Sequence, residues 1–142
     1  MTGRPTVDQQ RAKAAWNAIE DAKKLKGDQP KAFGGHAKKL PMRIRAAGLG
    51  QALAFVRAKA HPKGETAETK EGMVLLLDVL GSWVLSRVPS PNAGKDDNAL
   101  IEAILNGNSL FLRCAAAEAI AFLEWLNRFA EAEGLVDVNN NV

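Results

Sequence analysis

The chain has 142 residues, of which 46% are hydrophobic, 25% are charged and 6% are aromatic. This composition is typical of one globular domain, and it excludes a chain that is disordered throughout. The single cysteine excludes an internal disulfide and a cysteine-rich zinc site. Because the sequence shows neither a long apolar run nor an apolar leader, we expect a cytoplasmic protein without a membrane span.

Helix-forming residues dominate the sequence: alanine and leucine together number 40, whereas valine, isoleucine and threonine number 18. Alanine and leucine lose little side-chain freedom in a helix. Thr6 and Gln9 form a capping-box pattern that opens a first helix over residues 7–26, with Trp16 on its apolar face. Gly27 begins the turn that ends this helix.

A second helix is predicted over residues 31–47 and a third over residues 49–60, because apolar residues recur at helical spacing in both. Pro41 lies inside the second segment and is expected to kink or restart it, since proline has no amide hydrogen to donate. Gly48 separates the two helices. The stripe that the third helix is expected to bury consists of Leu49, Leu53, Val56 and Ala60.

Three further helices are predicted in the second half, between segments rich in proline, glycine and polar residues. They cover residues 69–88, 96–106 and 109–133. Ser109 is the expected cap of the last helix, which has the widest apolar surface and is therefore expected at the centre of the bundle.

No alternating strand pattern occurs, so the sequence predicts an all-α fold, a single compact bundle of about six helices. We expect one helical domain over residues 1–142. Its ordered core should cover residues 7–134, and residues 135–142 should form a frayed tail.

Residues that could support catalysis are scarce. Cys114 lies in an apolar helical stretch, which predicts a buried structural cysteine rather than a nucleophile. His36 and His61 lack metal-ligand spacing, and Glu118 and Glu124 are six residues apart on one helix and do not face each other. There is no glycine-rich phosphate loop. We therefore expect no enzymatic activity, no cofactor and no bound metal. The tryptophans expected to pack in the core are Trp16, Trp83 and Trp125.

The charge is distributed unevenly along the chain. Residues 1–62 contain 13 lysine and arginine residues against 4 acidic ones, whereas residues 63–142 contain 6 against 12. A basic half indicates a polyanionic partner, although a solvated basic surface or attraction between the two halves would also account for it. No exposed aromatic is expected among the cations, so contact with sugar-phosphate rather than base stacking is predicted. The basic cluster consists of Lys38, Lys39, Arg43, Arg45, Arg57 and Lys59.

Two segments resemble the signature motifs of the small helical subunit of the type III-B CRISPR (Cmr) RNA-silencing complex. They are LPMRIRAAGLGQALAFVRAK at residues 40–59 and EAIAFLEWLNRFA at residues 118–130. The resemblance implies an all-helical protein without catalytic activity. It also implies that several copies stack beside guide RNA and target RNA among other Cmr subunits, with a basic face along the target strand.

The resemblance also suggests site residues. Lys38, Lys39 and Lys59 match basic positions near the family's first motif, and Arg128 matches the arginine before Phe-Ala in the second. Three cations are additional in this chain: Arg43, Arg45 and Arg57. Ala47 replaces a frequent asparagine and Ala116 a frequent threonine, which removes capping or hydrogen-bonding roles there.

Two hypotheses of different classes follow. The leading one is an RNA-contacting, non-catalytic subunit of the Cmr complex. The alternative is a protein–protein adaptor that stacks on further copies of itself through opposite charges without contacting RNA. A small helical enzyme is a third and weaker hypothesis, because no convergent polar constellation supports it.

Overall fold

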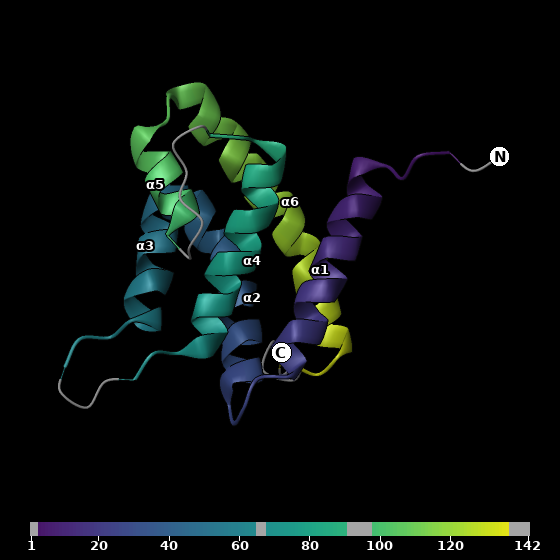
Figure 1. The fold of residues 1–142 in the computed structure, drawn as a ribbon, viewed down its shortest axis with the longest axis vertical. Coiled ribbons are helices and arrows are strands. Elements are labelled where there is room, and N and C mark those ends of the chain that lie inside the picture. Colours follow the sequence, from purple (N-terminus) through teal and green to yellow (C-terminus); the bar gives the residue numbers. More distant parts are fainter. Residues whose placement is uncertain (1–2, 65–67, 91–97, 137–142) are drawn as a thin grey trace.

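The computed structural model describes residues 3–64, 68–90 and 98–136, and in these residues it contains helices and no strand (Figure 1). The helices are α1 (Val7–Lys23), α2 (Gln29–Ala47), α3 (Leu49–Ala60), α4 (Glu71–Arg87), α5 (Ala99–Asn106) and α6 (Ser109–Ala132). The predicted all-α class is confirmed, and each predicted helix is present with bounds shifted by a few residues at most.

The packing is not centred on α6 alone, as its wide apolar surface suggested: α6 contacts α1, α2, α3 and α4, whereas α4 contacts α1, α2, α3, α5 and α6. In Figure 1, α1 and α6 lie on one side of the molecule, α3 and α5 on the other, and α2 and α4 between them. The largest fully buried side chains come from five of the helices, and none of the charged residues in the described ranges is buried. These large buried side chains include Ile19, Phe33, Leu40, Leu53, Leu76, Leu80, Phe122, Leu123 and Leu126.

The predicted capping box opens α1. The Thr6 side-chain oxygen accepts a hydrogen bond from the Gln9 amide at 3.0 Å, and Gln9 Oε1 accepts one from the Thr6 amide at 2.8 Å. The helix ends at Lys23, three residues before the expected end at 26. Lys24 and Leu25 instead donate to carbonyls three residues back, which tightens the last turn before Gly27 at φ +61°.

Pro41 does not restart the second helix, because α2 continues from Gln29 to Ala47 as one element. A proline inside a helix removes one hydrogen bond and costs about 3 kcal/mol. Leu40 and Ile44, on either side of Pro41, are buried in the core, and this packing holds the helix together. Gly48, at φ +89°, is both the end of α2 and the start of α3. The two helices therefore follow one another with a single glycine between them.

Several expectations for the last third of the chain are corrected. Asn108, not Ser109, caps α6, because its side-chain oxygen accepts from the Phe111 amide at 2.9 Å. Cys114 is exposed rather than buried, since the first turns of α6 extend past the core and also expose Leu110. Leu135 is buried, although it falls in the segment expected to fray. Other expectations, for residues 91–97 and 137–142, lie outside the described ranges.

The tryptophans lie at the edge of the core rather than within it. Trp16 is 40% exposed and packs edge-on against Phe129, with ring centroids 5.1 Å apart. Trp83 and Trp125 are half-buried, and each indole N–H donates to a carboxylate of another helix. An indole ring has one polar N–H that needs a partner, which explains why these large side chains remain near the surface.

Candidate nucleic-acid interface

Three of the predicted cations lie near one another on α2 and α3, and two of them contact an aromatic ring of α3. His36, Lys39 and Arg43 follow at spacings of three and four residues on α2, so they share one flank of the helix. On α3, Phe55 and Lys59 are four residues apart. We call His36, Lys39, Arg43, Phe55 and Lys59 the Phe55 cluster.

The ring contacts define the geometry of the cluster. The guanidinium carbon of Arg43 lies 4.1 Å from the centroid of the Phe55 ring, and Nζ of Lys59 lies 5.6 Å from the same centroid. Both distances fall within the range of a cation–π interaction. Phe55 is nonetheless 41% exposed, so part of its ring remains open to solvent.

The electrostatics of His36 show that Lys39 belongs to the same cluster. Burial lowers the pKa of His36 below its ordinary value of 6.5, and the positive charges of Arg43, Lys39 and Lys59 lower it further. In the part of the chain that the structure describes, no carboxylate lies within 4 Å of these three cations. Among the residues that the structure describes, the cluster is therefore a concentration of positive charge without an ion pair.

The sequence analysis missed Phe55, and its expectation that no exposed aromatic lies among the cations is wrong. The signal was present: Phe55 falls outside the predicted buried stripe of the third helix, and that stripe is indeed buried. An aromatic residue outside the stripe, four residues before Lys59, must lie near the surface beside a cation.

The remaining predicted cations lie in other surroundings. They are Lys38, Arg57, Arg45 and Arg128, of which the first two are half-buried and the last two exposed. Nη2 of Arg45 is 3.9 Å from Oε1 of Glu124 on α6. Arg128 lines an open depression of about 660 Å³ together with Glu124 and Glu131. The structure thus places Arg45 and Arg128 beside carboxylates of α6.

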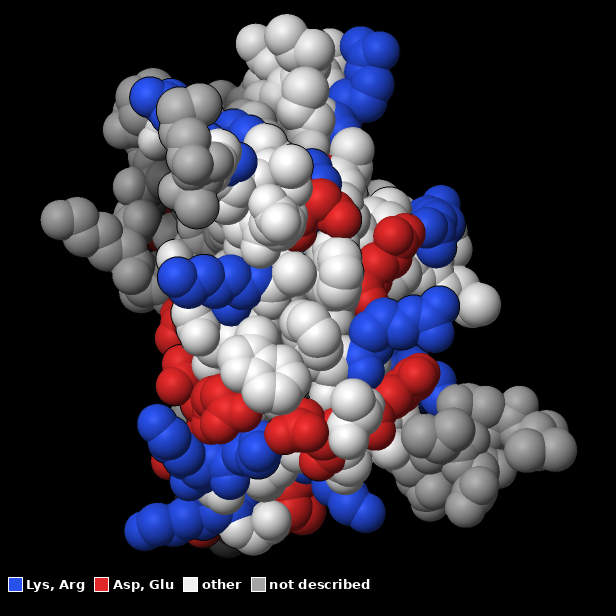
Figure 2. All heavy atoms as spheres, turned by 90° about the vertical axis from the view of Figure 1, so that its right-hand side faces the viewer, with Lys and Arg blue, Asp and Glu red and all other residues white. Residues whose placement is uncertain are grey.

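The opposite side of the molecule carries paired charges. Arg11 of α1 donates to both carboxylate oxygens of Glu118 on α6, from Nε at 2.6 Å and from Nη2 at 3.0 Å. Lys23 donates to Glu133 at 2.7 Å. Figure 2 views this side, and its blue and red side chains alternate around an uncharged centre. We call Arg11, Lys23, Glu118 and Glu133 the paired face.

Glu118 is the best-connected charged residue of the paired face. It also accepts a hydrogen bond at 3.0 Å from the indole N–H of Trp83. Burial would raise the pKa of Glu118, but the hydrogen bonds from Arg11 and Trp83, together with the positive charges of Arg11 and Arg87, outweigh burial and lower the pKa. The hydrogen bond to Glu118 in turn raises the pKa of Arg11. Because its partners lie far away along the chain, no local pattern in the sequence could reveal this ion pair.

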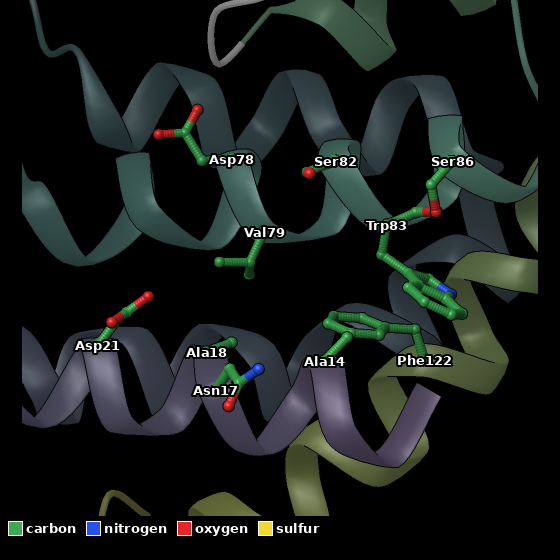
Figure 3. Close-up of a pocket in the computed structure, with 10 residues that line it drawn as sticks. All are labelled: Ala14, Asn17, Ala18, Asp21, Asp78, Val79, Ser82, Trp83, Ser86 and Phe122. Carbon is green, nitrogen blue, oxygen red and sulfur yellow. The ribbon is translucent and has the colours of Figure 1, made fainter. Parts of the chain in front are cut away.

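A second depression, of about 440 Å³, lies between α1 and α4. Asp21 and Asp78 stand at one end of it, and Trp83 and Phe122 at the other (Figure 3). Among the described residues, its lining includes serines but no histidine or lysine that could activate them.

Neither a metal site nor a membrane span is present in the described ranges. No group of three or more histidine, cysteine or acidic residues there is placed to hold a metal ion. None of the helices there is both long enough and apolar enough to cross a membrane.

Comparisons with known proteins agree with the resemblance noted in the sequence. The sequence model of the family described as CRISPR-associated protein (Cas_Cmr5) matches residues 7–133. The crystal structure of a CRISPR-associated Cmr5 family protein from Thermus thermophilus is similar to this fold, with a TM-score of 0.70 and 30% sequence identity. That match covers 94% of this chain and 100% of the other. The chain therefore belongs to the Cmr5 family, the small helical subunits of the CRISPR Cmr complex.

Proposed function

We propose that this chain is a non-catalytic small subunit of the type III-B Cmr effector complex in the cytoplasm, where it serves antiviral defence. In this role it stacks with further copies of itself and with other Cmr subunits. Its Phe55 cluster lines the groove for guide and target RNA. The observation that carries the proposal is the gathering of Lys39, Arg43 and Lys59 with no carboxylate within 4 Å in the described residues.

The physical argument concerns the cost of like charges. Cations held close together repel one another, and here no neighbouring acid among the described residues relieves that repulsion. A phosphate backbone relieves it and also releases its condensed counterions, which gives affinity without sequence preference. Because a single cluster makes few phosphate contacts, the free chain is expected to bind RNA weakly. Specificity then comes from guide–target pairing and from neighbouring subunits.

The linings of the two depressions support a role without catalysis. Neither one brings a nucleophile together with a histidine or lysine base among its described residues. Cys114, the single thiol of the chain, lies exposed on α6 and lines neither depression.

Charge reversal in the assembled complex tests the RNA contact. A variant carrying Lys39→Glu, Arg43→Glu and Lys59→Glu should bind target RNA more weakly. The slope of log K against log salt should become shallower by about 0.7 for each phosphate of a single strand that the variant leaves unneutralised.

The matched control carries Lys13→Glu, Lys24→Glu and Lys26→Glu, which makes the same charge change at residues on and just after α1, away from the Phe55 cluster. This control should bind target RNA with nearly wild-type affinity and slope. If both triple variants bind equally with equal slopes, the Phe55 cluster does not contact RNA.

The adaptor hypothesis makes a different prediction. If this chain stacks only through opposite charges on proteins, nuclease treatment of the complex should leave its attachment unchanged. The charges of the two halves already meet inside one chain, in the pairs Arg11–Glu118 and Lys23–Glu133. This internal pairing reduces the opposite charge available for a neighbouring copy, and it therefore favours the RNA-contacting role.

A further inference from the structure

Phe55 differs from the other aromatic residues of the molecule. Trp16, the other strongly exposed aromatic of the described ranges, packs against Phe129, whereas Phe55 has no aromatic partner there. Its ring is instead flanked by the cations Arg43 and Lys59. An exposed phenyl ring among cations combines two recognition elements: a flat apolar surface and positive charge.

We propose that Phe55 is a stacking platform for one unpaired nucleobase, while Arg43, Lys59 and Lys39 take the phosphates on either side of that nucleotide. This inference rests on the proposed function, and it adds a contact to the base where charge alone would predict contact only to the backbone. The class of ligand is a single-stranded nucleotide, because the bases of a duplex are stacked on one another and present no free face.

The ring explains why the ligand is a nucleotide and not merely an anion. Cations alone would suffice for a phosphate, and an open apolar ring would add nothing to its binding. A nucleobase covers the ring that is now 41% exposed and brings its own phosphates within reach of the ammonium groups. The guanidinium of Arg43 is planar, and like the ring it can lie against a base.

The state of Arg43 fits this assignment. Its Nη1 atom is buried and has no hydrogen-bond partner in the described residues. A buried donor left without an acceptor costs free energy. Turning the guanidinium toward a phosphate oxygen beside the ring would satisfy that donor, so a bound nucleotide would remove a cost that the free protein carries.

The test compares Phe55→Leu with Phe55→Trp in the assembled complex. Leucine keeps apolar bulk but removes the π face, so affinity for target RNA should fall roughly ten-fold, while tryptophan should retain it. The salt dependence of binding should stay the same in Phe55→Leu, because stacking releases no phosphate counterions. Trp16→Leu removes an aromatic of similar exposure from α1, so it is the matched control and should leave affinity unchanged.

A target strand with single abasic nucleotides shows whether a base is the ligand. At a position that stacks on Phe55, the abasic strand should bind the wild-type complex roughly ten-fold more weakly and the Phe55→Leu complex with little further loss. Equal affinity of wild type and Phe55→Leu at every position would overturn the proposal. So would failure of the Phe55→Leu complex to assemble, since the ring would then dock against a protein. If only the triple charge reversal weakens binding, the proposed function stands and the stacking contact is wrong.

Discussion

The paired face and the Phe55 cluster use the same residue types in opposite ways. On the paired face, Arg11 is held by Glu118, and the pair is shielded, with 23% and 10% of the two side chains exposed. In the Phe55 cluster, Lys39, Arg43 and Lys59 are brought together with a half-buried histidine, and no carboxylate of the described residues lies within 4 Å of them. Charges on the first surface stabilise the fold by pairing with opposite charges, whereas those on the second repel one another, although two of them contact the Phe55 ring.

Cations that count equally in the net charge have different surroundings on the two surfaces. Arg11 and Arg43 both belong to the basic half of the sequence, yet Arg11 pairs with a carboxylate of another helix and Arg43 lies over an aromatic ring. A count of cations therefore overstates the positive charge that has no acidic partner.

Breaking the paired face should have the largest effect on stability. Glu118→Ala leaves the Arg11 guanidinium and the Trp83 indole N–H without their acceptor, and it should lower the free energy of unfolding by about 2 kcal/mol. Urea denaturation measures this loss. Glu124→Ala, on the same helix, removes an exposed carboxylate 3.9 Å from Arg45 and should cost less than about 0.5 kcal/mol. Equal losses in the two variants would contradict the stabilising role assigned to the shielded Arg11–Glu118 pair.

Replacing a cation by a neutral residue should change the free energy of unfolding in opposite directions in the Phe55 cluster and on the paired face. Lys39→Gln removes repulsion from Arg43, which lies four residues further along α2, and should raise the free energy of unfolding by about 0.3 kcal/mol at low salt. The gain should vanish at high salt, where the charges are screened. Arg11→Gln should lower stability by about 1 kcal/mol instead, because it removes a charge-assisted hydrogen bond. A destabilised Lys39→Gln variant would show that an acidic partner holds that cation.

The smallest effect concerns the protonation of His36. Because its pKa in the folded protein lies below the ordinary 6.5, the unfolded chain takes up the proton first as the solution is acidified. The contribution of His36 to the free energy of unfolding is therefore complete above pH 6.5 and is lost as the pH falls through the folded-state pKa. His36→Gln should lose less stability over that range in urea denaturation.

An NMR titration of His36 reports on the cluster directly. Adding salt should raise the pKa of His36 toward its ordinary value by screening Arg43, Lys39 and Lys59, while the effect of burial remains. Lys59→Gln should also raise the pKa of His36. A pKa of His36 that does not respond to salt would place those cations further away than the structure does.

Local signals along the chain predict the helices. The Thr6–Gln9 pattern, the glycine at 48 and the periodic apolar residues each act within a few positions, so the helices and much of the core could be predicted. Cys114 shows where this reasoning fails. An apolar stretch of helix is buried only where another element covers it, and the first turns of α6 project beyond their neighbours.

Three properties of this protein follow from the order of its amino acids alone: the all-α class, the basic first half and the membership of the Cmr5 family. They depend on composition, periodicity and motifs. Which charged side chains come into contact depends instead on the packed fold. The Arg11–Glu118 pair joins residues that are 107 positions apart, and Arg43 and Lys59 reach the Phe55 ring from two different helices. The rotation of each helix about its axis is fixed by the burial of all the helices together. No single segment therefore encodes which of its cations remains without an acidic partner.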